Sequence, residues 1–391
     1  MKPIYLDYNA TTPTDPKVVE GMLPFLYENF GNPANVLNEY GWTADNAIKE
    51  ATESVAHLLK CHPHELVWNA GASEGNNTVV LTLIRKLKQL EPTEKIHFIT
   101  SEAEHLSVIN AFKAAQQFEN IELDIIPVSK EGIVTVDELK KFIKPHTKLV
   151  SLMWVNNEIG AINPIHELAT FCNDNKIYFH TDATQAIGKI EIDLQKTPVH
   201  FLTFSSHKFY GPKGVGAIFT RQQIQLDALI HGGGQQRNQR AGTMNVPAIV
   251  GTGIAAKIAA EKMHDESKYT RHLLQLFYSL LQSELPDIAV NGPAVEDQQH
   301  RSPMNLSICF SKPANLVLLQ LSSIAFSLGS ACSSAGVTSS HVLKAIGLTP
   351  EQAQSTIRFS VGRWTTEDDI QKAAKTLIEA FKPVKWQETN A

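Results

Sequence analysis

One short stretch of the chain places a lysine between two apolar runs: Phe204-Ser205-Ser206-His207-Lys208-Phe209-Tyr210-Gly211-Pro212-Lys213-Gly214. Residues 199–204 lead into this stretch and residues 216–219 follow it, and both runs are typical of buried β-strands. We therefore expect Lys208 at the end of a strand. Its amine either extends into water over the edge of the core or is desolvated, with a lowered pKa that lets it react with a carbonyl group.

The size and composition indicate a globular protein with a large domain and a smaller one. The chain has 391 residues, of which 43% are hydrophobic and 19% charged. A net charge of −5 gives no sign of a nucleic-acid-binding surface. No apolar run has the length of a membrane span, and residues 1–7 lack a signal-peptide core. We expect a cytoplasmic protein that binds neither nucleic acid nor membrane directly.

The order of apolar patterns predicts an α/β fold. Strand-like runs alternate with helical patterns, which favours a mostly parallel mixed sheet flanked by helices. We expect strands at 66–68, 95–100, 121–128, 149–155 and 177–181, and helices at 16–29, 42–60, 74–88, 106–117, 136–143 and 165–175.

The carboxyl-terminal third predicts a smaller α+β domain. A helical stretch over 247–285, broken near His264, leads into strands at 305–310 and 356–360 and helices at 315–322 and 369–381. We place the large domain at residues 14–257, and the small domain at residues 1–13 and 258–391.

Polar residues gather where the predicted parallel strands end, which is where ligands bind in such sheets. Together they offer what a pyridoxal phosphate (PLP) site needs: an amine, an acid for the pyridine nitrogen, a platform for the ring, a partner for the phenolic oxygen and a phosphate cradle. These residues are Ala72, Ser73, His105, Asn157, Asp182, Gln185, Ser205, His207 and Lys208.

Each of these residues also has an ordinary interpretation. Asp182 could keep the pyridine nitrogen protonated or cap the start of a helix. His105 could stack on the ring or be a plain first-turn histidine. Gln185 and Asn157 could bind the phenolic oxygen, although amides are common in turns.

The phosphate cradle is expected at the start of a helix. Ala72 and Ser73 would offer backbone N–H groups there, and Ser205 and His207 would complete the cradle.

The four cysteines, at positions 61, 172, 309 and 332, form no CxxC pair, which argues against a structural zinc site or a disulfide framework. Cys332 lies in a run of small residues, so we expect a mobile exposed loop at about 325–340. Its thiolate would be an accessible nucleophile, or else the thiol is incidental. Arg358, inside a strand pattern, could bind a substrate carboxylate or pair with a surface acid.

These motifs together resemble the NifS/IscS-type cysteine desulfurases, which are class V relatives among the fold-type I PLP enzymes. The long serine-rich segment around Cys332 is similar to the group with an extended cysteine loop. The resemblance covers nearly the whole chain and includes residues 6–13, 71–74, 104–105, 155–160, 182–185, 205–208, 231–234, 240–243, 329–332 and 358–360.

The resemblance implies a cofactor site. Lys208 would hold PLP, His105 would stack on the ring and Asp182 would pair with the pyridine nitrogen. Thr243 would reach the phosphate of a neighbouring subunit, which implies a homodimer.

The resemblance also implies the reaction. Arg358 and Asn157 would bind the carboxylate of L-cysteine, while Lys208 and His105 would move protons. Cys332 would take the sulfur as a persulfide, releasing L-alanine, and pass it to an acceptor protein in iron–sulfur cluster assembly or in tRNA or DNA thiolation.

Some positions depart from the family pattern. Ala34-Asn35 and Asn38 stand where a Ser-Ser pair and a histidine are usual, and Gln236, Asn238 and Ser206 are also changed. Residues 381–386 do not resemble the tail that docks the iron–sulfur scaffold, which leaves open a specialised desulfurase that serves tRNA or DNA thiolation or a dedicated cluster system.

Two alternatives remain open. The chain could be a selenocysteine lyase or another class V β-eliminating enzyme. It could also be an idle paralogue acting as a complex subunit, although intact Lys208, Asp182, His105, Cys332 and Arg358 speak against that.

Overall fold

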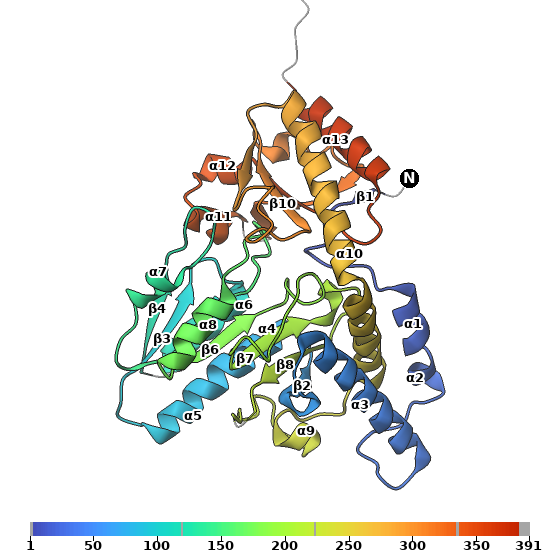
Figure 1. Cartoon of the computed structure of the whole chain (residues 1–391), viewed down its shortest axis with the longest axis vertical. Coiled ribbons are helices and arrows are strands. Elements are labelled where there is room, and N and C mark those ends of the chain that lie inside the picture. The colour runs from blue at the N-terminus through green and yellow to red at the C-terminus, as the bar shows by residue number, and fades with distance from the viewer. Residues whose placement is uncertain (1–2, 119, 223, 334–335, 383–391) are drawn as a thin grey trace, which may run out of the picture.

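The computed structural model describes residues 3–118, 120–222, 224–333 and 336–382. A seven-stranded sheet forms the centre of the larger part of these residues, in the order β2-β8-β7-β6-β5-β3-β4 (Figure 1). Neighbouring strands are parallel except around β8, which is antiparallel to β7 and β2. This confirms the mostly parallel mixed sheet. The strands are β2 (Leu66–Asn69), β3 (Ile96–Ser101), β4 (Ile121–Ile126), β5 (Thr147–Ser151), β6 (Tyr178–Asp182), β7 (Phe201–Ser205) and β8 (Gly216–Thr220).

Helices cover both faces of this sheet, which explains why its central strands are apolar throughout. One face packs against α3 (Glu39–Leu59), α8 (Ile165–Asp174) and the start of α10 (Val246–Glu284). The other packs against α5 (Leu83–Leu90) and α6 (Leu106–Phe118). The short helices α4 (Ala72–Asn77), α7 (Val136–Lys140) and α9 (Gln235–Asn238) lie at the ends of strands and in connections.

The smaller part is built on a four-stranded antiparallel sheet in the order β12-β15-β10-β9. Its strands are β9 (Ala289–Asn291), β10 (Asn305–Cys309), β12 (Ser327–Leu328) and β15 (Thr356–Ser360), and α13 (Glu367–Phe381) and the end of α10 pack on it (Figure 1). The short helices α11 (His341–Ala345) and α12 (Pro350–Gln354) complete this part.

The amino terminus joins the smaller part. Strand β1 (Ile4–Tyr5) pairs in parallel with β11 (Ile324–Ala325), and Leu6 belongs to the smaller part's hydrophobic core. This supports, as a proposal, the division into residues 14–257 and residues 1–13 with 258–391.

Three predicted helices differ from the structure. The helix expected over 16–29 is divided into α1 (Pro16–Met22) and α2 (Pro24–Tyr27), since Pro24 has no N–H for the helical ladder. The expected break near His264 is absent, because no proline or glycine interrupts α10 there. The segment 315–322 forms only a 3₁₀ turn over Ala314–Val317.

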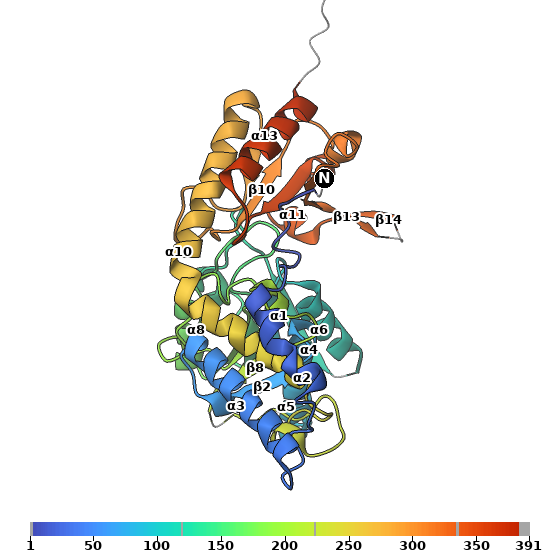
Figure 2. The ribbon, with the colours of Figure 1, turned by 90° about the vertical axis from the view of Figure 1, so that its right-hand side faces the viewer.

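The segment around Cys332 contains regular structure where an irregular loop is expected. Strands β13 (Ser330–Ser333) and β14 (Gly336–Ser339) pair antiparallel, with Cys332 opposite Val337. The pairing gives the backbone of this small-residue segment internal hydrogen-bond partners. Figure 2 shows this hairpin projecting from the smaller part.

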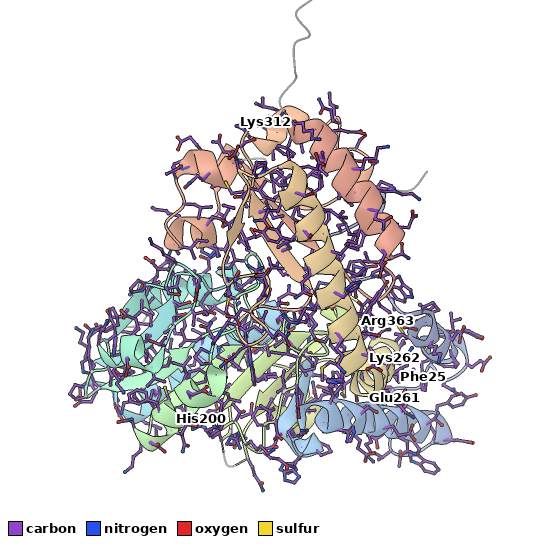
Figure 3. All side chains as sticks on the ribbon, turned by 45° about the horizontal axis from the view of Figure 1, so that its top comes forward. Phe25, His200, Glu261, Lys262, Lys312 and Arg363 are labelled. Carbon is purple, nitrogen blue, oxygen red and sulfur yellow. The ribbon has the colours of Figure 1, made fainter. Side chains whose placement is uncertain are left out.

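Arg363 joins the two parts of the molecule (Figure 3). Its guanidinium pairs with Asp15 and with Glu266 of α10, where Nε lies 2.6 Å from Oε1. It also stacks 4.0 Å from the centre of the Tyr210 ring. Both ion pairs are largely buried, so they fix the segment that follows β15 against Asp15 and α10.

Within the described residues, no helix combines the length and apolar character that a membrane crossing requires.

Candidate active site

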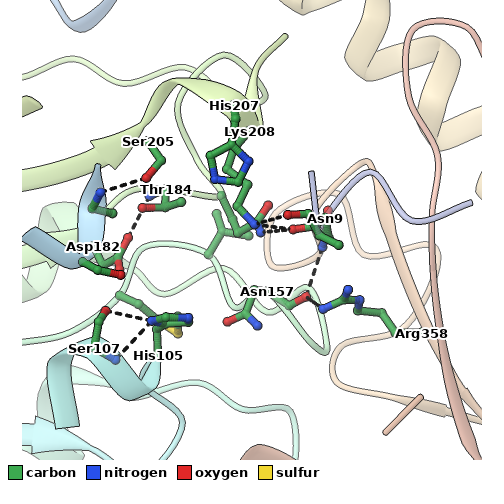
Figure 4. Close-up of a pocket in the computed structure, with 16 residues that line it drawn as sticks. Asn9, His105, Ser107, Asn157, Asp182, Thr184, Ser205, His207, Lys208 and Arg358 are labelled. Carbon is green, nitrogen blue, oxygen red and sulfur yellow. Dashed lines mark hydrogen bonds between the residues drawn. The ribbon is translucent and has the colours of Figure 1, made fainter. Parts of the chain in front are cut away.

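A cavity of about 200 Å³ lies at the carboxyl ends of the central strands (Figure 4). Asp182 ends β6, Ser205 ends β7, and Lys208 lies in the 3₁₀ turn that follows β7. Because these strands are parallel, their carboxyl ends lie at the same edge of the sheet, and residues far apart in the sequence meet there. The lining residues are Asn9, Ala10, Ala72, Ser73, His105, Ser107, Met153, Val155, Asn157, Asp182, Thr184, Gln185, Ser205, His207, Lys208 and Arg358.

The amine of Lys208 is directed into the protein and not into water. Its Nζ donates to the backbone carbonyl oxygens of Asn9, at 2.7 Å, and Ala10, at 2.8 Å. Burial lowers the pKa of Lys208 to about 8, and the Arg358 guanidinium acts in the same direction. A larger fraction of the amine is therefore uncharged near neutral pH than for a free lysine.

Asp182 is buried and its carboxylate is held from both sides. Oδ2 accepts from the Asn76 amide at 2.8 Å, and Oδ1 accepts from the Thr184 backbone N–H at 2.9 Å. The second contact is the local turn expected of an ordinary aspartate. Asp182 nevertheless lines the cavity, where it lies across from Arg358 with Lys208 between them (Figure 4).

A chain of hydrogen bonds connects Asp182 with His105. The Asn76 amide donates to Asp182 and also to Ser107 Oγ, at 2.8 Å. Ser107 Oγ lies 2.7 Å from His105 Nδ1, and the Ser107 backbone N–H donates to the same nitrogen at 3.2 Å. Since Nδ1 accepts a hydrogen bond, the proton of a neutral His105 ring lies on Nε2.

Sequence reasoning missed Asn76 and Ser107. Asn76 is completely buried and follows Ala72 by four residues, which places the two on one face of the same helix. That spacing was the available signal for Asn76. Ser107 follows His105 by two residues, but no pattern in the sequence distinguishes it.

The expected phosphate cradle is assembled from two segments. Ser205 Oγ accepts from the Ala72 backbone N–H at 2.8 Å, so β7 is tied to the start of α4. The preceding residue, Gly71, has a φ of +137°, a conformation that favours glycine. His207 bonds through Nδ1 to Thr11 Oγ1 at 3.0 Å, and burial lowers its pKa to about 4. Its ring is therefore neutral at physiological pH.

Gln185 and Asn9 form a second network. Gln185 Nε2 donates to the Asn9 backbone oxygen at 2.9 Å, and this oxygen also accepts from Lys208. Gln185 Oε1 accepts from the amine of Lys189, a buried residue that sequence reasoning also missed. Asn9 was missed too, because its contact with Lys208 spans 199 positions.

Arg358 lies at the side of the cavity near the smaller part. Nη2 donates to Asp7 Oδ1 at 2.8 Å and to Ser327 Oγ at 2.7 Å, and Nη1 donates to the Asn157 backbone oxygen at 3.1 Å. Its Nε is buried without an acceptor among the described residues. Arg358 therefore pairs with an acid, as its ordinary interpretation predicts. The acid is Asp7, however, and the pair lies at the wall of the cavity and not on the open surface.

One of the predicted site residues lies outside this cavity. Thr243 is exposed and lines a separate hollow of about 260 Å³ together with Asn69 and Arg240. Cys332 belongs to β13, and its side chain lies outside the described part of the structure.

The model of the aminotransferase class-V family matches residues 4–373. The chain belongs to this family. Among its relatives, the cysteine desulfurase IscS of Methylobacillus flagellatus is 42% identical over 371 residues, covering 94% of this chain and 89% of the relative. The cysteine desulfurase of Homo sapiens is 39% identical, covering 98% of this chain and 82% of the relative.

Solved structures of similar proteins superpose on nearly the whole chain. A NifS-like protein superposes with a TM-score of 0.87 at 32% identity, covering 96% of this chain and 98% of that one. A structure described as SspA in complex with cysteine superposes with a TM-score of 0.81 at 33% identity, covering 93% and 99%. The chain thus has the fold of the family's NifS-like members, fold type I of the PLP enzymes.

Class-V members depend on PLP, and the residues present here fit that cofactor. The cavity holds an amine with a lowered pKa and an acid fixed by two donors. Three lining residues also carry buried polar atoms without partners among the described residues: Asn9 Oδ1, Thr184 Oγ1 and Arg358 Nε. Buried polar groups of this kind favour a polar ligand.

Proposed function

We propose that this protein is a PLP-dependent cysteine desulfurase, a sulfurtransferase that converts L-cysteine to L-alanine. The observation that carries this function is the lowered pKa of the Lys208 amine in a cavity that also holds Asp182 and Arg358. The relatives are named cysteine desulfurases, and this does not favour the selenocysteine lyase or the idle-subunit alternative.

The residues that would hold the cofactor surround Lys208. Lys208 would form the covalent link, Asp182 would face the pyridine nitrogen and His105 would lie against the ring. Gln185 would donate to the phenolic oxygen. Ala72, Ser73, Ser205 and His207 would hold the phosphate, with Thr243 of a neighbouring subunit. When bound, PLP acts as an electron sink for bonds at the substrate carbon attached to it.

The carboxylate of L-cysteine would bind at Arg358, with Asn157 beside it. The Nε of Arg358 is the donor that supports this assignment, because it is buried and has no acceptor among the described residues. A guanidinium binds a carboxylate through two parallel hydrogen bonds when both donors are free to turn toward it. Asp7 accepts a hydrogen bond from Nη2 of Arg358 and would therefore compete with the substrate carboxylate for this donor.

Once the substrate amine replaces it, Lys208 would be free to move protons. A pKa of about 8 lets the amine serve as base and acid near neutral pH, a contribution of roughly 10²–10⁴-fold in rate. His105, with its Nε2–H directed by the Ser107 contacts, would be the second proton carrier.

Cys332 would remove the sulfur. Its thiolate attacks the substrate sulfur, so that an S–S bond forms and the C–S bond breaks. The electron pair remains with the substrate carbon, which takes up a proton to give alanine. The three cysteines with described side chains are poor nucleophiles by comparison, because burial raises the pKa values of Cys61, Cys172 and Cys309.

Both ends of the cysteine-bearing segment contact residues that line the cavity or adjoin lining residues in the chain, which supports the role of Cys332. On one side Ser327 Oγ bonds to Arg358. On the other, Ser340 Oγ bonds to Glu158 Oε2 at 2.5 Å and the His341 ring bonds to the Glu104 carbonyl oxygen at 2.8 Å. The hairpin is therefore attached beside the cavity at both of its stems.

A homodimer and an acceptor protein complete the proposal. Large apolar side chains are exposed over residues 19–42, among them Phe30, at 67%, and Leu37, at 87%. A surface of this kind fits a subunit interface. The sulfur would pass to a protein acceptor in the cytoplasm, in iron–sulfur cluster assembly or in tRNA or DNA thiolation.

The cofactor assignment is tested by trapping bound PLP with borohydride and mapping the labelled peptide. We expect the label on Lys208 and a colourless Lys208→Ala protein. Lys213→Ala is the matched control, since Lys213 lies in the same turn but is exposed, and it should remain yellow. A label on another lysine of the wild-type protein would overturn the assignment.

A further inference from the structure

Lys189 is a buried lysine next to the cavity that the mechanism above does not use. It follows Gly188 in the turn after β6, and 4% of it is exposed. Lysines are rarely buried to this degree without a partner of opposite charge. Among the described residues, its amine donates only to Gln185 Oε1, a neutral acceptor.

The charged groups that act on Lys189 are both cations, Lys208 and Arg358. Burial, together with these two cations, lowers the pKa of Lys189 well below its ordinary value. The burial of the Lys189 amine without an acid therefore costs folding free energy. This amine contacts Gln185, which lines the cavity.

The hydrogen bonds of Gln185 fix the direction of its amide. The Asn9 backbone oxygen can only accept, so Gln185 Nε2 must face it, at 2.9 Å. Oε1 then faces Lys189. The NH₂ group of a glutamine has two hydrogens, and the bond to Asn9 occupies one. The second is available to a ligand in the cavity that Gln185 lines.

We propose that Lys189 is a positioning residue, which holds the Gln185 amide with its N–H groups toward the cavity so that Gln185 donates to the phenolic oxygen of PLP. This inference rests on the proposed function. Without the Lys189 amine, Gln185 Oε1 loses its partner, and only the bond from Nε2 to the Asn9 oxygen still opposes a turn of the amide. A turned amide would present an acceptor to the anionic oxygen and repel it.

The test is a pH titration of the visible absorption of bound cofactor, comparing wild type with Lys189→Met. A donor to the phenolic oxygen stabilises its anionic form, so loss of that donor should raise the pH midpoint by about one unit. Lys213→Met, which changes an exposed lysine, should leave the midpoint unchanged.

A second pair of variants tests whether Lys189 acts through Gln185. Gln185→Ala should raise the midpoint as Lys189→Met does, and the double variant should show no further rise. Additive shifts would overturn the proposal, because Lys189 would then act on the cofactor by its own charge. An unchanged midpoint in Lys189→Met with cofactor bound would also overturn it.

Two controls keep the outcome interpretable. If Lys189→Met does not fold, Lys189→Asn replaces it: the shorter polar side chain does not reach Gln185 Oε1, so the midpoint should rise. An unchanged midpoint there would overturn the inference. Each protein is first checked for PLP on Lys208, since failure of that check in the wild type refutes the proposed function and not this inference alone.

Discussion

Lys208 shares its surroundings with two other cationic side chains. Arg358 lowers the pKa of Lys208 directly, Lys189 acts on the neighbouring His207, and the Asn9 carbonyl oxygen accepts a hydrogen bond from Lys208. Burial and this crowding favour the uncharged amine, while Asp182 and Asp7 oppose it. The reactivity of Lys208 therefore comes from its neighbours and from desolvation more than from its residue type.

The pKa of Lys208 predicts how PLP loading depends on pH. Only the uncharged amine attacks the PLP aldehyde, so the rate at which cofactor-free protein gains visible absorption should rise with pH to a midpoint near 8. An Arg358→Gln variant should shift this midpoint upward, because it removes a cation that lowers the pKa. Arg358→Lys, which keeps the charge, serves as the control. A wild-type midpoint near 10.5, the ordinary lysine value, would contradict this explanation.

At the scale of residues, the position along the chain was sufficient to predict several residues that line the cavity. It was not sufficient to predict the residues that hold those side chains in place. Asp182 and Ser205 could be placed because each follows an apolar strand, and strand ends meet at one edge of a parallel sheet. Asn9 and Lys189 could not. Their roles depend on contacts with Lys208 and Gln185 that only the folded chain creates.

The junction between β3 and α6 depends on a buried acid, Glu104. Its Oε1 accepts from Ser101 Oγ at 2.9 Å and from the Met153 N–H at 2.8 Å, while Oε2 has no partner among the described residues. Burial raises the pKa of Glu104 to about 8. The junction thus carries a protonated acid at neutral pH, directly before His105.

This pKa predicts a pH-dependent stability. The folded protein keeps the Glu104 proton up to about pH 8, whereas the unfolded chain releases it near 4.5, so this acid makes unfolding easier as the pH rises between those values. Glu104→Gln, which imitates the protonated acid, should unfold at a higher urea concentration than wild type, with a difference that grows from pH 5 to 8. Exposed Glu102→Gln is the control. A constant difference across this range would be inconsistent with a raised pKa.

At the scale of elements, the strongly periodic segments were predicted well and the connections poorly. The central strands and α3, α6, α8 and α13 lie close to their predicted positions, because their apolar spacing reports a buried face. The hairpin β13–β14 was missed, since a run of small residues has no hydrophobic period that would reveal a strand pair.

At the scale of the whole molecule, the candidate active site is shared between the two parts of the chain. The larger part supplies Lys208 and Asp182, and the smaller part supplies Arg358 and also carries the hairpin with Cys332. The ion pair of Arg363 with Asp15 and the hydrogen bond from Arg358 Nη1 to the Asn157 backbone oxygen hold the parts together at this point. The stems of this hairpin contact Arg358 and Glu158, so the hairpin begins and ends beside the cavity.

The transfer of sulfur to Cys332 tests this arrangement as a whole. After incubation with L-cysteine and no reductant, the peptide containing Cys332 should gain the mass of one sulfur atom. With reductant present, alanine should form over many turnovers. Cys309→Ser, which changes a half-buried thiol with a raised pKa, is the matched control and should behave as wild type.

The decisive comparison is alanine formation by Cys332→Ser. We predict that this variant still changes its visible absorption when L-cysteine is added, but that alanine formation falls by roughly 10²-fold or more, because burial raises the pKa values of the three thiols with described side chains. Alanine formation at the wild-type rate by Cys332→Ser would contradict the proposed sulfur transfer.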